Sequence, residues 1–163
     1  MTNQATSPAA NPINSVAADL AQSDTLSSSA ACLDHLNHQT LRTYFATLNA
    51  GNFEATANLF ASSGQLLPPF ESAITGQDAI LAYLQSEAKG LVALPQTEIV
   101  GDAVNNPNDD THPMTSIDVV GKVQTALFTV NVKWQFLLNA QSEIVRVKIK
   151  LLASLQDLVH LRR

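Results

Sequence analysis

The sequence predicts an α+β fold in which a curved antiparallel or mixed sheet packs against three helices on its concave side. Apolar residues recur at helical spacing between residues 33 and 89, and they alternate with polar residues over several stretches after residue 98. Helices followed by long antiparallel strands, each with one apolar face, are typical of this class. A sheet curved around a few helices encloses a cone with an apolar pocket at its mouth.

Composition separates an N-terminal segment, 1–32, from the rest of the chain. Twenty-four of its residues are Ala, Ser, Thr, Asn, Gln or Pro, and none is aromatic or basic. Such a stretch buries too little apolar surface to offset the entropy of ordering it. We expect a mostly disordered or weakly structured tail, with one or two helical turns at 15–22, whose deletion leaves the fold intact. The folded domain is expected over 33–163.

Three helices are expected in the first half of this domain. The first carries apolar residues at 3.6-type spacing over 33–48 and ends at Gly51, since glycine is common just past a helix. The second is short, 52–61, and begins at an asparagine cap. An extended segment, 66–70, follows because its two prolines disfavour helix. The third helix spans 78–89.

The second half of the domain reads as sheet. Strict alternation of apolar and polar residues over eleven positions is the strongest of these signals. Four strands are expected, at 98–104, 117–123, 128–138 and 145–151. The polar stretch 105–113 is expected to be a long hairpin loop between the first two strands. A short amphipathic helix, 154–163, closes the chain.

Charge and composition exclude several classes of protein. The chain has 163 residues, nine Lys and Arg against fourteen Asp and Glu, and a net charge of −5, so it lacks the basic footprint of a nucleic-acid binder. No apolar run reaches the length of a membrane span, and no basic residue precedes Arg42, so no secretory signal is expected. The single cysteine, Cys32, excludes an internal disulfide. We expect a soluble, cytoplasmic protein.

The residues usual in catalysis and metal binding do not form a recognisable motif. His35 and His38 are spaced i, i+3, but no third ligand follows at a suitable distance in the sequence, so solvated surface histidines are the favoured interpretation. His112 falls in the polar loop. Asp118 alternates onto the face opposite the apolar side chains of its strand, which disfavours a buried general base.

Basic side chains gather late in the sequence on one predicted face of the sheet. A solvated face is the favoured interpretation, and a docking surface for an acidic segment is the alternative. The residues are Lys133, Arg146, Lys148 and Lys150.

Two amphipathic aromatic residues are expected on apolar faces. Tyr44 lies on the inner stripe of the first helix, and Trp134 lies on the apolar face of its strand. A phenol and an indole each carry a hydrogen-bond donor that needs a partner when it is buried. Two donors in an apolar cavity suit a carbonyl oxygen on a large apolar ligand. From residue types alone, core aromatics satisfied by backbone or water remain the favoured interpretation.

Five blocks of sequence carry a family resemblance: LRTYFATLNAGNFEATANLF, PPFESAITGQDAILAYL, GKVQT, NVKWQFLLN and KLLAS. In order and with few gaps, they resemble the carotenoid-binding C-terminal domain of the orange carotenoid protein over residues 37–163. The resemblance is greatest to the stand-alone homologues of that domain, a branch of the NTF2-like fold found in cyanobacteria. It implies an NTF2-like cone and a keto-carotenoid ligand similar to canthaxanthin or echinenone.

The resemblance also implies site residues. The family's two hydrogen-bond donors to the keto oxygen fall on Tyr44 and Trp134. The implied pocket wall consists of Leu48, Leu91, Thr125, Phe128 and Ile149. In the two-domain protein a proline and a tryptophan are expected where this chain has Ala126-Leu127-Phe128, so one aromatic wall is replaced by an aliphatic one.

The implied function is that of a non-enzymatic, water-soluble carrier that stores carotenoid in photoprotection or antioxidant defence. The resemblance implies a homodimer sharing one carotenoid, exchange with helical carotenoid proteins, and transient membrane contact during pigment uptake. The helical N-terminal domain of the family is absent from this sequence, so switching by domain separation is not expected. Cys32 lies outside the matched region. Two alternatives stay open: a small NTF2-like isomerase or cyclase, and a ligand-free dimerisation module.

Overall fold

The computed structural model describes residues 33–106 and 109–152. The expected tail, 1–32, and the expected closing helix, 154–163, lie outside the described residues. Within the described ranges the chain forms the three helices α2 (Gln39–Asn49), α3 (Phe53–Ala57) and α4 (Gln77–Glu87). It also forms the six strands β1 (Phe60–Leu67), β2 (Ile74–Thr75), β3 (Val92–Asn106), β4 (Asp109–Gln124), β5 (Thr129–Leu138) and β6 (Ile144–Leu152).

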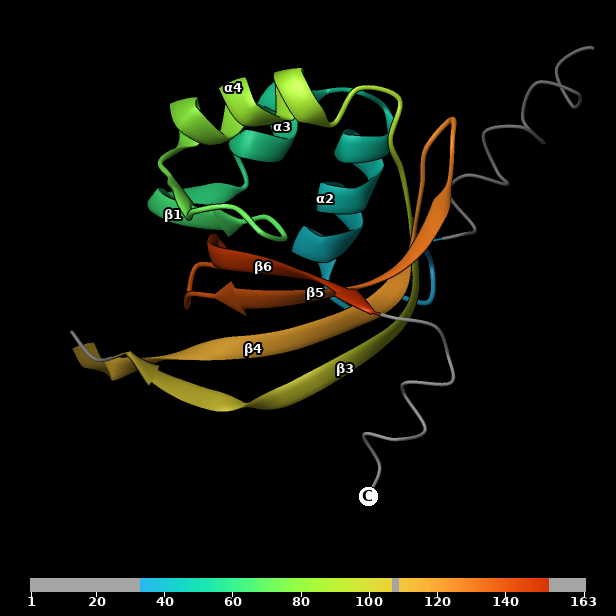
Figure 1. The fold of residues 1–163 in the computed structure, drawn as a ribbon. Helices are drawn as coiled ribbons and strands as arrows, with labels where there is room; N and C mark the ends of the chain where they lie inside the picture. The colour runs from blue at the N-terminus through green and yellow to red at the C-terminus, as the bar shows by residue number, and fades with distance from the viewer. Residues whose placement is uncertain (1–32, 107–108, 153–163) are drawn as a thin grey trace, which may run out of the picture. The chain divides into compact units, whose positions relative to one another are not determined.

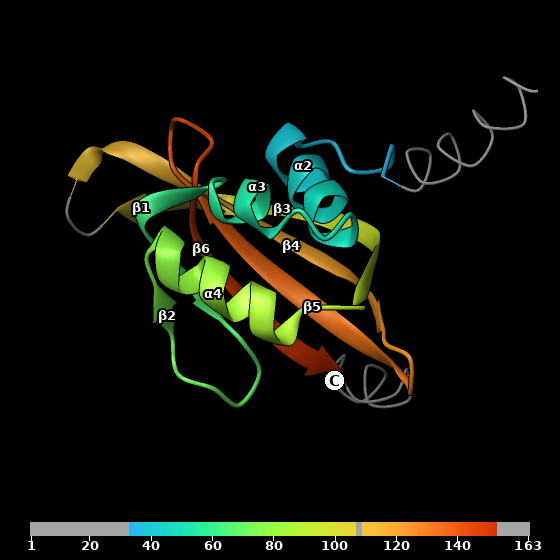
Figure 2. The ribbon, with the colours of Figure 1, turned by 90° about the horizontal axis from the view of Figure 1, so that it is seen from above.

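The six strands form one mixed sheet in the order β2-β1-β6-β5-β4-β3. Only β1 and β6 run parallel, and every other neighbouring pair is antiparallel. All three helices lie over the same face of the curved sheet (Figures 1 and 2). The predicted fold class is therefore confirmed, including a mixed sheet packed against three helices.

Helix α2 begins later than its apolar spacing predicts. The chain at 33–35 forms a turn, and α2 starts at Gln39 with His38 as its cap. The carboxylate of Glu98 on β3 accepts hydrogen bonds from the backbone N–H groups of Asn37, at 2.8 Å, and of His38. Because these N–H groups bond to a distant strand and His38 is the cap, residues 37 and 38 do not join the helix.

The predicted second helix is wrong beyond its first half. Helix α3 ends at Ala57, and Phe60 opens strand β1 instead of completing the helix. Phe60 pairs with Ile144 of β6, and the backbone N–H of Ile144 donates to the carbonyl of Leu59 at 2.9 Å. Pairing with a strand more than eighty residues away thus overrides the local helical spacing.

The polar stretch 105–113 is not the long loop that its composition predicts. Strand β3 continues to Asn106 and β4 begins at Asp109, so only 107–108 separate the two strands. Val104 pairs with Met114 and the ladder extends to the last residue of β3. Backbone pairing does not require apolar side chains, and polar residues therefore continue a hairpin that apolar residues began.

Strands β3 and β4 approach each other closely at Gly121. This residue pairs with Pro95, next to a shift of register. A Cβ atom on residue 121 would overlap the backbone carbonyl of Leu94 and the Cα of Pro95. Because backbone cannot move aside as a side chain can, we expect Gly121→Ala to lower the free energy of unfolding by about 2–4 kcal/mol. Urea denaturation measures this change.

Gly101→Ala is the matched control for this substitution. It adds the same methyl group to the partner strand, where the nearest atom is the Ser116 Cβ at 3.4 Å. We expect it to change the free energy of unfolding by less than about 1 kcal/mol. Equal effects of the two substitutions would contradict the close approach at Gly121.

Candidate functional site

A cavity of about 350 Å³ lies between the helices and the sheet. Helices α2 and α4 supply one side of its lining, and β1, β3, β4, β5 and β6 supply the other. The lining is mostly apolar. It includes Tyr44 and Trp134, which the sequence pattern singled out, and the five wall residues that the resemblance implied: Leu48, Leu91, Thr125, Phe128 and Ile149. Residues separated by more than one hundred positions therefore meet at one place.

Tyr44 and Trp134 are held in this lining by edge-to-face ring contacts. The Tyr44 ring lies 5.2 Å from that of Phe45 and 5.1 Å from that of Phe136, measured between ring centres. The Trp134 ring lies 5.0 Å from that of Phe45. Such pairs contribute roughly 0.5–1.5 kcal/mol each beyond the area they bury. Phe45 thus positions both amphipathic aromatics, and each is only 1% exposed.

The two donors in this lining have no partner among the described residues. Neither the Tyr44 hydroxyl nor the Trp134 indole N–H makes a hydrogen bond to any of them. Backbone therefore does not satisfy them in the described part of the chain, which leaves water or a ligand atom as their acceptor. The only fully buried side-chain N or O atom without a partner in the described residues is the Glu98 Oε1, so the two unpartnered donor atoms border open space. Because both residues line the cavity, their donors are available to an acceptor atom inside it.

Burial also keeps the Tyr44 hydroxyl in its donor form. It raises the pKa of that hydroxyl well above its usual value. Above a pH of about 10, where unfolded tyrosine ionises, the folded state therefore holds more protons than the unfolded state, and stability falls as the pH rises. We expect Tyr44→Phe to lessen this fall, measured as melting temperature between about pH 8 and pH 11. An equally steep fall in the variant would contradict the assignment.

The edge of the cavity contains residues that the sequence pattern did not predict. Pro68 and Pro69, from the loop after β1, line the cavity together with Tyr83 and Glu87 of α4. The Tyr83 hydroxyl donates to the Glu71 Oε1 at 3.4 Å. Burial, with the negative charges of Glu71 and Glu87 adding to it, raises the pKa of Tyr83 to about 12. Two features of the sequence could have pointed to this edge: the adjacent prolines, and the position of Tyr83 one helical turn from Glu87.

The cavity lining holds a single ionisable carboxylate among the described residues. That residue, Glu87, is exposed at the end of α4. A general base of the isomerase or cyclase type must reach the substrate inside the cavity. The buried polar groups of the lining are instead the two neutral donors. No cluster of three His, Cys, Asp or Glu side chains suited to a metal occurs in the described part of the chain.

Several large apolar side chains next to the cavity are exposed. Phe128 lines the cavity and is 57% exposed, and its neighbour Leu127 is 90% exposed. Leu151, at the end of β6, also lines the cavity and is partly exposed. We call Leu127, Phe128 and Leu151 the apolar rim; Phe70, in the loop after β1, is a further exposed apolar residue. Exposed apolar groups gathered at one place mark interaction sites.

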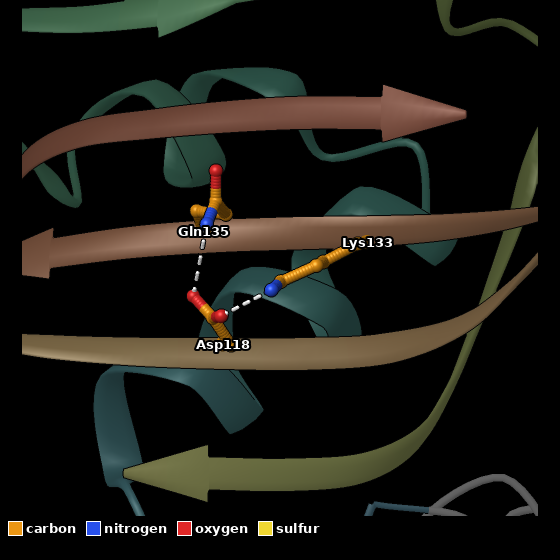
Figure 3. Close-up of polar contacts among 3 residues, drawn as sticks. All are labelled: Asp118, Lys133 and Gln135. Atoms are coloured by element: carbon orange, nitrogen blue, oxygen red, sulfur yellow. Dashed lines mark hydrogen bonds and ion pairs between the residues drawn. The ribbon is translucent and has the colours of Figure 1, made fainter. Parts of the chain in front are cut away.

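The opposite face of the sheet carries polar groups, as its alternation predicts. Asp118 forms an ion pair with Lys133 at 2.5 Å and accepts a hydrogen bond from Gln135 at 3.4 Å (Figure 3). Lys133 pairs across the strands with Lys150, and Gln135 pairs with Lys148, so these side chains share this face. Asp118 is therefore engaged outside the cavity. None of the helices in the described residues could cross a membrane.

Comparison with known families agrees with this architecture. Residues 36–149 match the nuclear transport factor 2 (NTF2) domain. The chain belongs to the NTF2 domain family. The NTF2-like fold that the resemblance implies is thus confirmed.

Curated relatives of this NTF2 domain are orange carotenoid-binding proteins. The protein from Synechocystis sp. is 35% identical over 144 residues, which are 86% of this chain and 43% of that protein. The match covers the C-terminal part of such proteins. The chain spans about two fifths of the length of the curated relatives it matches.

Solved structures that resemble this chain include an orange carotenoid protein. The orange carotenoid protein of Anabaena (Nostoc) sp., solved binding canthaxanthin, is 38% identical, with a TM-score of 0.66 over 77% of this chain and 39% of that chain. A ketosteroid isomerase-like protein from Erwinia carotovora atroseptica is 15% identical, with a TM-score of 0.52 over 71% of this chain and 92% of that chain. The second likeness shows the fold alone.

Proposed function

We propose that this NTF2 domain is a water-soluble carrier that binds a keto-carotenoid in the cavity and passes it to other carotenoid proteins. The observation that carries this proposal is the pair of donors, Tyr44 and Trp134, that lack a partner in the described chain and lie in a mostly apolar cavity. A keto-carotenoid is a long hydrocarbon with a carbonyl acceptor on its end ring. Relatives that are orange carotenoid-binding proteins support the same ligand class.

The residues present fit one end of such a ligand. Aliphatic side chains would surround the ring, and the hydroxyl and the indole N–H would donate to its keto oxygen. The Tyr44 hydroxyl and Trp134 N–H would then gain the acceptor that the described chain does not give them. Specificity for a keto group follows, because a hydrocarbon ring would leave both donors buried and unpaired.

The apolar rim supports transfer by direct contact. Its exposed residues would be covered by whatever delivers or receives the pigment: a second copy, a helical carotenoid protein or, transiently, a membrane surface. We propose that the resting carrier is a homodimer sharing one pigment. Storage in photoprotection follows from the same binding and needs no catalytic group. A non-enzymatic role also agrees with the neutral donors of the cavity.

Expression in carotenoid-producing cells tests the proposal. We expect the purified protein to be coloured, with a visible spectrum shifted from that of the free pigment. Ala93→Phe, which fills the cavity from β3, should give a colourless folded protein. Ala103→Phe is the matched control, since it makes the same change at an exposed position of the same strand. Colourless wild-type protein from cells that accumulate canthaxanthin would contradict the proposal.

A further inference from the structure

The loop between β1 and β2 carries an aromatic residue in a strained conformation. Phe70 has a φ of 64°, and its side chain is 94% exposed. The left-handed region is unfavourable for a bulky residue, and an exposed ring gains no packing in return. The other non-glycine residue with positive φ in the described chain, Ser142, lies in the turn between β5 and β6, where such a conformation is common. Residues with a strained backbone conformation of this kind cluster at functional sites.

The neighbours of Phe70 place it beside the cavity. Pro68 and Pro69, directly before it, line the cavity. Glu71, directly after it, accepts the hydrogen bond from Tyr83, which also lines the cavity. The loop thus runs from the cavity edge to a polar contact with α4, beside which it lies in Figure 2. Phe70 itself does not line the cavity, although Pro69 before it does and Glu71 after it is hydrogen-bonded to a lining residue.

The size of the cavity leaves part of a carotenoid outside it. About 350 Å³ is near the lower end of the range for pockets that enclose small ligands, roughly 300–1,000 Å³. A cavity of this size has room for one end ring and the start of the chain. A carotenoid has forty carbons and two end rings, so the rest of it stays outside. The polyene must therefore leave the cavity across its edge, where its apolar surface requires cover.

We propose that Phe70 completes the binding site by packing against the part of the polyene that projects from the cavity. The inference rests on the proposed function and names a ligand contact that the cavity alone does not contain. An aromatic ring packs well on a flat conjugated chain, and the contact removes apolar area of both from water. The strained backbone holds the ring outside the protein core, where the ligand can reach it.

Two ligands and two matched variants test this inference. Phe70→Ala is compared with Ile99→Ala, a change at an exposed apolar residue that pairs with Asp118, which is engaged outside the cavity. Canthaxanthin probes the whole site, and 4-oxo-β-ionone, which has the same ring and only a short stub of the chain, probes the cavity alone. We expect Phe70→Ala to release canthaxanthin on the order of tenfold faster and to bind the short ketone as wild type does.

Further outcomes separate the ligand contact from a structural role. Ile99→Ala should bind both ligands as wild type does. Phe70→Tyr, which keeps an aromatic ring, should release canthaxanthin as slowly as wild type. Phe70→Gly should be at least as heat-stable as wild type, because glycine adopts this φ without strain. Release of canthaxanthin at the wild-type rate from Phe70→Ala, with wild type binding both ligands, would overturn this inference alone. Wild type that binds neither ligand would overturn the proposed function with it.

Discussion

Replacing Tyr44 by Phe should weaken canthaxanthin binding roughly 5- to 150-fold, which corresponds to about 1–3 kcal/mol. The substitution keeps the ring and its edge contacts with Phe45 and Phe136 but removes the donor. The keto oxygen then remains buried with one partner fewer. The absorption maximum should also shift, because hydrogen bonds to the keto oxygen polarise the polyene. Trp134→Phe should act in the same direction, and the effects of the two changes should not add, because both donors serve one oxygen.

The ligand-free protein gives the distinguishing control. The Tyr44 hydroxyl has no partner within the described chain, so Tyr44→Phe should leave the ligand-free protein at least as stable as wild type. Thr40 lies on the same helix, and its hydroxyl donates to the backbone carbonyl of Ser142 at 2.9 Å. Thr40→Val should therefore destabilise the protein by about 0.5–1.5 kcal/mol without changing the pigment spectrum. The reverse pattern, with Tyr44→Phe unstable and spectrally unchanged, would contradict the assigned site.

The pigment-loaded form should be a dimer that contains one carotenoid. A folded body of about 120 residues has a radius of gyration of roughly 14 Å, and a carotenoid is comparable in length to the width of such a body. One cavity of about 350 Å³ encloses only part of it. A second copy related by a two-fold axis would cover the rest with an identical cavity and an identical pair of donors. Light scattering should give a mass near twice 17.4 kDa.

Substitutions on two surfaces locate this dimer. Leu127→Asp places a charge on the apolar rim, where the side chain is 90% exposed. It should prevent the pigment-loaded dimer without affecting the fold, because a charge at a desolvated contact costs several kcal/mol. Ile99→Lys places a charge on β3, directly across from the acidic Asp118, and should leave the dimer intact. Loss of the dimer with Ile99→Lys alone would move the interface to the sheet. A pigmented monomer with one carotenoid per chain would contradict the shared ligand.

The sequence predicted the parts of the fold that depend on local pattern. Period-two alternation located β5 and β6 within one residue at each end, and a glycine and an asparagine marked where α2 ends and α3 begins. Local pattern did not predict the elements whose formation depends on residues far away in the sequence. Phe60 belongs to β1 because β6 lies beside it, and the long ends of β3 and β4 exist because each strand supports the other.

The same division applies to the candidate site. Tyr44 and Trp134 could be singled out because a donor on an apolar stripe is visible in sequence. Alternation in the sequence shows on which face of a strand a residue lies, but not which residues it pairs with on the next strand. The structure was therefore needed to show that both side chains line one cavity. Tyr83 and the strained Phe70 could not be predicted, because their roles depend on where the loop after β1 lies against α4. The resemblance supplied the wall residues, and the structure brings all of them to the cavity.

A fluorescence titration tests the central claim most directly, because Trp134 is the only tryptophan of the sequence and lines the cavity. Bound carotenoid close to the indole should quench its emission, whereas free tryptophan amide in the same solution corrects for absorption by the pigment. We expect addition of canthaxanthin to quench Trp134 to saturation, with the end point at one pigment per two chains. Emission that falls no more than that of the free amide would show that the cavity does not take the pigment.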